Sequence, residues 1–129
     1  MDIGDEPIIR LVDSMLSEAV RLRASDVHLE PAPHDVRIRY RIDGILQDVN
    51  TSPKALQGPI VSRIKIMAGL NIAEKRLPQD GRMQLAVEGR VLDARISTLP
   101  AIHGESVVMR LLDRSQPVRG LAALGLLPG

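Results

Sequence analysis

Hydrophobic residues recur at the spacing of a helix in two stretches of the chain, residues 7–23 and residues 53–69. In residues 7–23 apolar side chains return every three or four positions, which is typical of an amphipathic helix that lies on a larger structure. They are Ile8, Leu11, Val12, Met15, Leu16, Ala19, Val20 and Leu22. Residues 53–69 predict a second helix with Leu56, Ile60, Ile64 and Met67 on its buried stripe. Because proline fits poorly inside a helix, we expect a helix start or a kink near Gly58 and Pro59.

Alternation of apolar and polar residues predicts strands in the first half of the chain. Residues 27–30 alternate in this way, and residues 36–42 give the clearest strand. Its apolar positions are Val36, Ile38, Tyr40 and Ile42, and arginines occupy the positions between them. Asp43 and Gly44 form a strong two-residue hairpin signal, so residues 45–49 are predicted to return as the partner strand. Residues 50–53 are expected to form a turn.

The second half of the chain reads as a hairpin followed by a loop and a further strand. Gln79, Asp80 and Gly81 predict a turn that opens it, and Glu88 and Gly89 predict the turn that folds it back. Residues 70–77 could add one helical turn before Pro78. Residues 91–98 and 106–112 are mostly apolar, which suits strands covered on both faces.

The predicted order is helix, three strands, helix, three strands. Short hairpin links between the strands favour antiparallel pairing. The fold class is therefore α+β, a mostly antiparallel sheet with helices packed on one face.

The composition narrows the classes of function. The 129 residues suit one domain, and a net charge of +1 gives no general attraction to nucleic acid. Tyr40 is the only aromatic residue, so the stacking platforms of single-stranded nucleic-acid binders are missing. No cysteine, signal peptide or membrane-spanning run is present, and we expect a cytoplasmic protein that binds no nucleic acid.

Motifs of catalysis and metal binding are largely absent from the sequence. It has no GxxxxGK[ST] phosphate loop and no GxSxG elbow. His28, His34 and His103 have no spacing typical of metal ligands, so no metal site is predicted. Asp43 and Asp80 precede glycines and are explained by turns. Asp26 and Glu30 flank a strand and could equally be solvated.

The remaining candidates for a functional role are arginines. Arg95 and Arg110 lie in the two apolar strands, where a permanent charge needs an anionic partner or a route to water. Ion pairs with Asp93, Glu105 or Asp113 and the binding of an external anion both satisfy that need.

Two further sets of arginines are weaker candidates for a functional role. Arg76 and Arg82 are candidates to support the loop around the predicted Gln79–Gly81 turn, and Arg37, Arg39 and Arg41 form a stripe that is either solvated or contacts an acidic partner.

Five segments occur in an order and at a spacing typical of one family. They are ASDVHLEP, VRIRYRIDGIL, RIKIMAGLNIAEKRLPQDGR, LDARISTLP and HGESVVMRLLD. Together they closely resemble the secretion ATPases of the type II secretion and type IV pilus assembly family. The similarity runs from about residue 7 to residue 113 and covers only that family's second N-terminal domain, a PAS-like α+β module. The family's Walker A and Walker B motifs have no counterpart here, so the resemblance implies a module of residues 1–120 and, in residues 121–129, the start of a linker to a RecA-like ATPase domain.

The resemblance implies a function for this module. Members form cytoplasmic homo-hexamers, peripheral at the inner membrane, that hydrolyse ATP with Mg to drive pseudopilus or pilus assembly through inner-membrane platform proteins. The module closes over ATP bound on the RecA-like domain of its own or a neighbouring subunit. Arg95 and Arg110 match the arginines that point to the phosphates. The chain by itself is then expected to be no enzyme and to hold no cofactor.

Two alternatives from other classes accompany this reading. One is a sensory domain of PAS-like shape that binds a small ligand in its core. The other is a protein-interaction module that docks an acidic partner through Arg37, Arg39 and Arg41.

Overall fold

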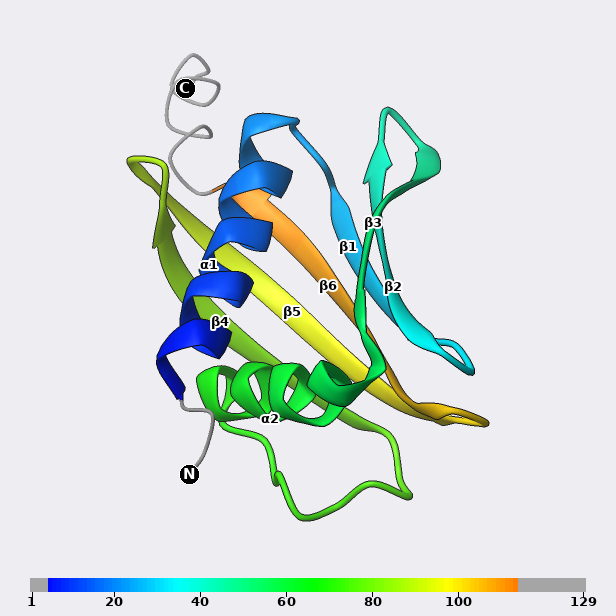
Figure 1. Ribbon diagram of the computed structural model, residues 1–129. Helices are drawn as coiled ribbons and strands as arrows, with labels where there is room; N and C mark the ends of the chain where they lie inside the picture. The colour runs from blue at the N-terminus through cyan, green and yellow to red at the C-terminus, as the bar shows by residue number, and fades with distance from the viewer. Residues whose placement is uncertain (1–4, 114–129) are drawn as a thin grey trace.

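Two helices lie on one face of a six-stranded antiparallel sheet in the computed structural model, which describes residues 5–113 (Figure 1). The elements in chain order are α1 (Asp5–Arg21), β1 (Asp26–Pro31), β2 (Asp35–Ile42), β3 (Ile45–Pro53), a 3₁₀ turn (Lys54–Leu56), α2 (Gln57–Ala68), β4 (Gln79–Val87), β5 (Arg90–Ala101) and β6 (Gly104–Asp113). The structure confirms the α+β class and the placement of both helices on one face. The predicted module end at residue 120 and the linker from residue 121 lie outside the described residues.

The sheet brings the two halves of the chain together at its centre. Its strand order is β3-β2-β1-β6-β5-β4, so the meander β1-β2-β3 joins the meander β4-β5-β6 through the pair β1 and β6. These two strands are antiparallel, with Asp26 opposite Arg110. Residues far apart in sequence therefore share one row across the sheet.

The core lies between the helices and one face of the sheet. The apolar stripe of α1 is buried there as predicted, and Val12 and Leu16 are almost completely covered. Leu22 is an exception, with 44% of its surface exposed, because α1 ends at Arg21 and the chain turns at Arg23 with a φ of 60°. In α2, Ile60 and Ile64 are buried as expected.

The expectation that the strands 91–98 and 106–112 are covered on both faces is wrong. Leu92, Ala94 and Ile96 of β5 face the helices and are buried, whereas Arg95 between them is exposed. Both helices lie on the same side, so the opposite face, here called the open face, has no covering element among residues 5–113 (Figure 1). The continuous apolar pattern arises because the open face also carries apolar side chains, among them Leu99 at 47% exposure.

The two hairpin turns are confirmed. Asp43 and Gly44 have φ angles of 52° and 80°, and Glu88 and Gly89 have 52° and 74°. Positive φ at both central residues is the backbone that matches the twist of antiparallel strands.

Three local predictions are wrong. Residues 50–53 extend β3, residues 70–77 contain no helical turn, and Gln79–Gly81 lies inside β4. Gly81 is needed for close approach, since an added Cβ would lie 2.8 Å from Leu70 Cδ2 and 3.0 Å from the Ala68 carbonyl oxygen. Pro59 marks a helix start, because it lies in the first turn of α2, where its missing N–H is not needed.

Candidate functional site

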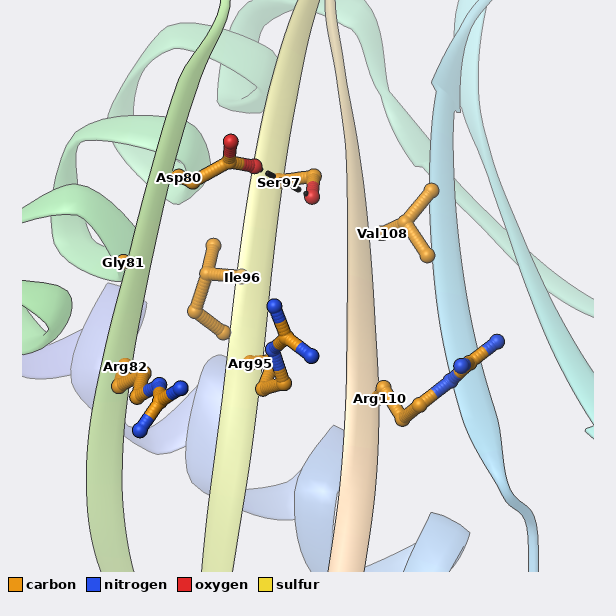
Figure 2. Close-up of a pocket in the computed structure, with 8 residues that line it drawn as sticks. All are labelled: Asp80, Gly81, Arg82, Arg95, Ile96, Ser97, Val108 and Arg110. Atoms are coloured by element: carbon orange, nitrogen blue, oxygen red, sulfur yellow. Dashed lines mark hydrogen bonds between the residues drawn. The ribbon is translucent and has the colours of Figure 1, made fainter.

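Three arginines stand side by side on the open face, one on each of three neighbouring strands. Arg82 of β4 is directly opposite Arg95 of β5, and Arg95 is directly opposite Arg110 of β6. We call these three the arginine row. Residues in register point to the same face of a sheet, so the row is a consequence of strand pairing. Figure 2 shows it from the open side, with the helices behind the sheet.

Two members of the row have no internal partner. Within residues 5–113, the side chains of Arg82 and Arg95 make no ion pair or hydrogen bond, and both are exposed. One of the expected partners of the strand arginines is engaged elsewhere, since Glu105 pairs with Lys65. Like charges placed directly opposite each other repel, and an anion between them would relieve that repulsion.

Arg110 has an acidic partner that the sequence did not indicate. Its Nε donates to Asp26 Oδ1 at 3.2 Å, and Asp26 Oδ2 accepts from Arg41 Nε at the same distance. The Asp26 side chain is only 5% exposed, so of the alternatives that the sequence left open, a solvated carboxylate does not apply to Asp26. In Figure 2 the Arg110 guanidinium points away from Arg95 and toward β1.

A pocket of about 440 Å³ lies along the arginine row. Its lining includes the whole row together with Asp80, Ser97 and Val108. The Ser97 hydroxyl donates to Asp80 Oδ1 at 2.8 Å, which places this carboxylate in the cross-strand row next to the arginines. Asp80 is therefore part of the open face and not of a turn, because Gln79–Gly81 is strand.

The stripe of arginines on β2 is mostly engaged within the fold. Arg39 pairs with Glu30 at 3.3 Å and with Asp48 at 2.6 Å, and Arg41 pairs with Asp26. Arg37 is exposed and has no ion pair in the part of the chain that the structure describes. The three arginines that the sequence grouped as one stripe therefore differ in their partners, since Arg39 and Arg41 are paired with acidic residues and Arg37 is not.

Arg76 and Arg82, grouped in the sequence, also lie apart. Arg76 belongs to the segment between α2 and β4, and its backbone N–H donates to Glu74 Oε2 at 2.8 Å. The Gln79 side chain ties that segment down, since its Nε2 donates to the Asn71 carbonyl oxygen and its Oε1 accepts from the Asn71 N–H, both at 2.9 Å.

A buried ion pair fixes the same segment to the core. Lys65 of α2, 1% exposed, lies 2.9 Å from Glu105 of β6, and its Nζ also donates to the Glu74 carbonyl oxygen at 2.7 Å. Sequence patterns missed Lys65 because it sits beside Ile64 in an otherwise apolar helix face, and its partner lies 40 residues further along the chain.

Other site types find little support in residues 5–113. No group of three His, Cys, Asp or Glu side chains there could hold a metal ion. Over the same residues, neither helix has the length and apolar character needed to cross a bilayer.

Comparison with known proteins gives consistent matches along nearly the whole chain. A family model described as "Type II/IV secretion system protein" matches residues 2–129. "Type II secretion system protein E" of Xanthomonas campestris pv. campestris is 54% identical over 125 residues, which are 96% of this chain and 22% of that protein. "Type II secretion system protein HxcR" of Pseudomonas aeruginosa is 54% identical over 95% of this chain and 26% of its own length. "Type II secretion system ATPase E" of Vibrio cholerae is 49% identical over 95% of this chain and 24% of its own length.

The alignments cover nearly all of this chain but only a small part of each relative. The chain spans only about a quarter of the length of the curated relatives that it matches. Most of each relative therefore has no counterpart in these 129 residues.

Proposed function

Because the chain belongs to the type II/IV secretion system protein family, we propose that it is a regulatory module that completes the phosphate site of a secretion ATPase. In this proposal ATP binds to a RecA-like domain in the remainder of a longer protein. The module then closes over the nucleotide and brings Arg95 and Arg110 to its phosphates. The parent protein is the enzyme, and these 129 residues alone hydrolyse no ATP.

The observation that carries the proposal is the exposed, unpartnered Arg95 at the centre of the arginine row. An arginine held on a strand presents a rigid fork of N–H donors, which matches the oxygens of a phosphate group. Its neighbours in the row supply further positive charge on both sides. A binding site for a polyanion is the function that this arrangement supports best.

The open face is also suited to be covered by another domain. Val91, Leu99 and Leu112 are large apolar residues on β5 and β6 that expose about half of their surface, at 48%, 47% and 51%. They lie on the same face as the arginine row. Burial of these side chains would favour closure of the module, at about 25 cal/mol per Å² of apolar surface removed from water.

The proposed chemical role of the arginines is electrostatic. Phosphoryl transfer spreads charge over the oxygens of the transferred group, and an arginine aimed at them stabilises the transition state without covalent chemistry. The RecA-like domain would bind the adenine, the Mg ion and the attacking water. The arginine row would add charge only when the domains close, so domain motion would gate hydrolysis.

The proposed assembly follows the family. The parent is a homo-hexamer at the cytoplasmic side of the inner membrane, where it powers pseudopilus or pilus assembly through platform proteins. The nucleotide that Arg95 and Arg110 contact then lies on the RecA-like domain of the same or of a neighbouring subunit.

The test is steady-state ATP hydrolysis by the full-length protein that carries this module. We expect Arg95→Ala and Arg110→Ala to lower kcat by about 10²–10³, the loss typical of one transition-state donor. Arg37→Ala is the matched control, since Arg37 is an exposed arginine on the same face, and it should keep its kcat within twofold. Wild-type kcat in both row variants would overturn the proposal.

A further inference from the structure

Arg82 is directly opposite Arg95 on the open face, although nothing in the sequence assigned it to phosphate binding. We infer that Arg82 is a third anion-contacting residue of this site and that the site takes an oligophosphate, a ligand with charge on more than one phosphate group. The inference rests on the proposed function and deepens it.

The first step is that Arg82 has no structural task in the fold. It lies in β4 and not in a loop, its side chain is exposed, and it makes no ion pair or hydrogen bond with any residue between 5 and 113. The carboxylate one row away, Asp80, accepts its hydrogen bond from Ser97. A guanidinium that stabilises nothing inside the domain has all five of its donors available for a ligand.

The second step is the relation between Arg82 and Arg95. Side chains directly opposite on antiparallel strands have Cβ atoms about 4.5–5.5 Å apart, and two like charges at that separation destabilise the pair. An anion placed between them replaces this repulsion with two charge-assisted hydrogen-bond pairs. Figure 2 shows both guanidinium groups in front of the sheet, and both residues line the pocket.

The third step concerns the size of the ligand. The row crosses three strands, so its outer members are two strand spacings apart, roughly 10 Å. One phosphate is satisfied by a single neighbouring pair of arginines. Two or three linked phosphates can contact all three arginines of the row at their own positions. A single phosphate would have to draw the three guanidinium groups together, where the repulsion between them would be greatest. The pocket of about 440 Å³ leaves room for such a ligand.

Arg82 and Arg110 differ in how they are held. Arg110 already gives its Nε to Asp26 and is turned toward β1, whereas Arg82 is unrestrained. The pair Arg82 and Arg95 is thus the part of the row with the most unused donors. We therefore expect it to make the first contact with an incoming oligophosphate.

The experiment is a titration of the 129-residue chain with tripolyphosphate and, separately, with inorganic phosphate, followed by amide NMR shifts at low ionic strength. Low salt is needed because exposed charges are strongly screened. We expect saturable shifts on β4, β5 and β6. Arg82→Gln and Arg95→Gln should each weaken tripolyphosphate binding about tenfold, as expected for loss of one charged hydrogen-bond partner. The loss in Arg82→Gln should be smaller for inorganic phosphate.

Two further variants sharpen the result. Arg37→Gln removes the same charge from the same face but outside the row, and it should change binding less than twofold. Arg82→Lys keeps the charge and loses the planar fork, so its affinity should fall between those of the wild type and Arg82→Gln. Amide spectra that change only on the substituted strand and the strands paired with it would show that each variant is folded.

The outcomes separate this inference from the proposed function. If Arg95→Gln weakens binding and Arg82→Gln behaves like Arg37→Gln, Arg82 is not a ligand contact and the inference fails, while the phosphate site stands. If no saturable shifts appear on β4, β5 and β6, or if Arg95→Gln has no effect, the phosphate site itself fails and the inference falls with it.

Discussion

Asp26 and Arg110 lie 84 positions apart in the sequence and are joined by a hydrogen bond of 3.2 Å between Arg110 Nε and Asp26 Oδ1. The second oxygen of the same carboxylate accepts from Arg41 Nε, so one buried acid links β1, β2 and β6. Arg110 itself is 65% exposed. Only its Nε donates to a residue within 5–113, and Arg110 also lines the pocket beside Arg95. In the proposed function this one residue stabilises the sheet and also contacts the phosphates.

The first prediction is that Asp26→Asn destabilises the chain by about 1–3 kcal/mol, because a buried charged acceptor is lost between two guanidinium groups. The free energy of unfolding is measured with urea. Asp48→Asn is the matched control, since Asp48 also pairs with an arginine but is 71% exposed, and exposed pairs contribute at most about 1 kcal/mol. Equal losses in the two variants would show that burial of Asp26 is unimportant.

Local sequence patterns predicted the elements that depend on neighbouring residues. The stripe of α1, the alternation on β2 and both hairpin turns follow from periodicity and from positive φ at Gly44 and Gly89. The predicted turn at Gln79–Gly81 failed for an instructive reason. Glycine there serves close packing against Leu70 and Ala68, and sequence alone does not distinguish that need from a turn.

The geometry of the site depends on contacts between distant residues, which local patterns do not report. Arg95 and Arg110 stood out from their apolar neighbours, but the covered environment inferred for them was wrong because both are exposed. Arg82 enters the row only through the register of β4 and β5, and Asp26 only through the pairing of β1 with β6. That central pairing joins the two halves of the chain, and no turn connects its strands.

The second prediction concerns the buried pair of Lys65 and Glu105, whose side chains are 1% and 7% exposed. Lys65→Met should cost about 3–5 kcal/mol, because it leaves the Glu105 charge buried without its partner. In the double variant Lys65→Met with Glu105→Leu, most of that loss should return, since two apolar side chains replace two buried charges. Thermal or urea unfolding of these two variants and of the single variant Glu105→Leu completes the cycle. Additive losses in the double variant would contradict a direct coupling between the two residues.

The third prediction compares two glycines. Gly81→Ala should destabilise by about 1–3 kcal/mol, because the new methyl group would lie too close to Leu70 and to the Ala68 carbonyl oxygen. Gly58→Ala is the control, since a Cβ there has no neighbour within 4 Å and the residue lies in α2. It should be neutral or stabilise by about 0.4–1 kcal/mol. The comparison is made by the midpoint of urea unfolding, and a Gly81→Ala midpoint at or above that of Gly58→Ala would refute it.

The fourth prediction concerns Tyr40, whose hydroxyl lies 3.0 Å from the Met15 carbonyl oxygen and 2.9 Å from Glu18 Oε1. Burial, and then the hydrogen bond and negative charge of Glu18, raise the pKa of Tyr40 well above its ordinary value. The folded state thus favours the neutral phenol. This contribution to stability is complete below the unfolded pKa of about 10 and is lost as the pH rises above it.

Tyr40 can be followed by itself, because the chain has one tyrosine and no tryptophan. In the folded chain the ultraviolet band of tyrosinate should remain absent at a pH where the urea-unfolded chain shows it fully. Glu18→Gln should let the band appear at lower pH, since the second cause of the shift is removed. The free energy of unfolding should fall above pH 10 by up to about 1.4 kcal/mol per pH unit more in the wild type than in Tyr40→Phe. Identical alkaline slopes in these two proteins would mean that the Tyr40 hydroxyl is not held in its neutral form by the fold.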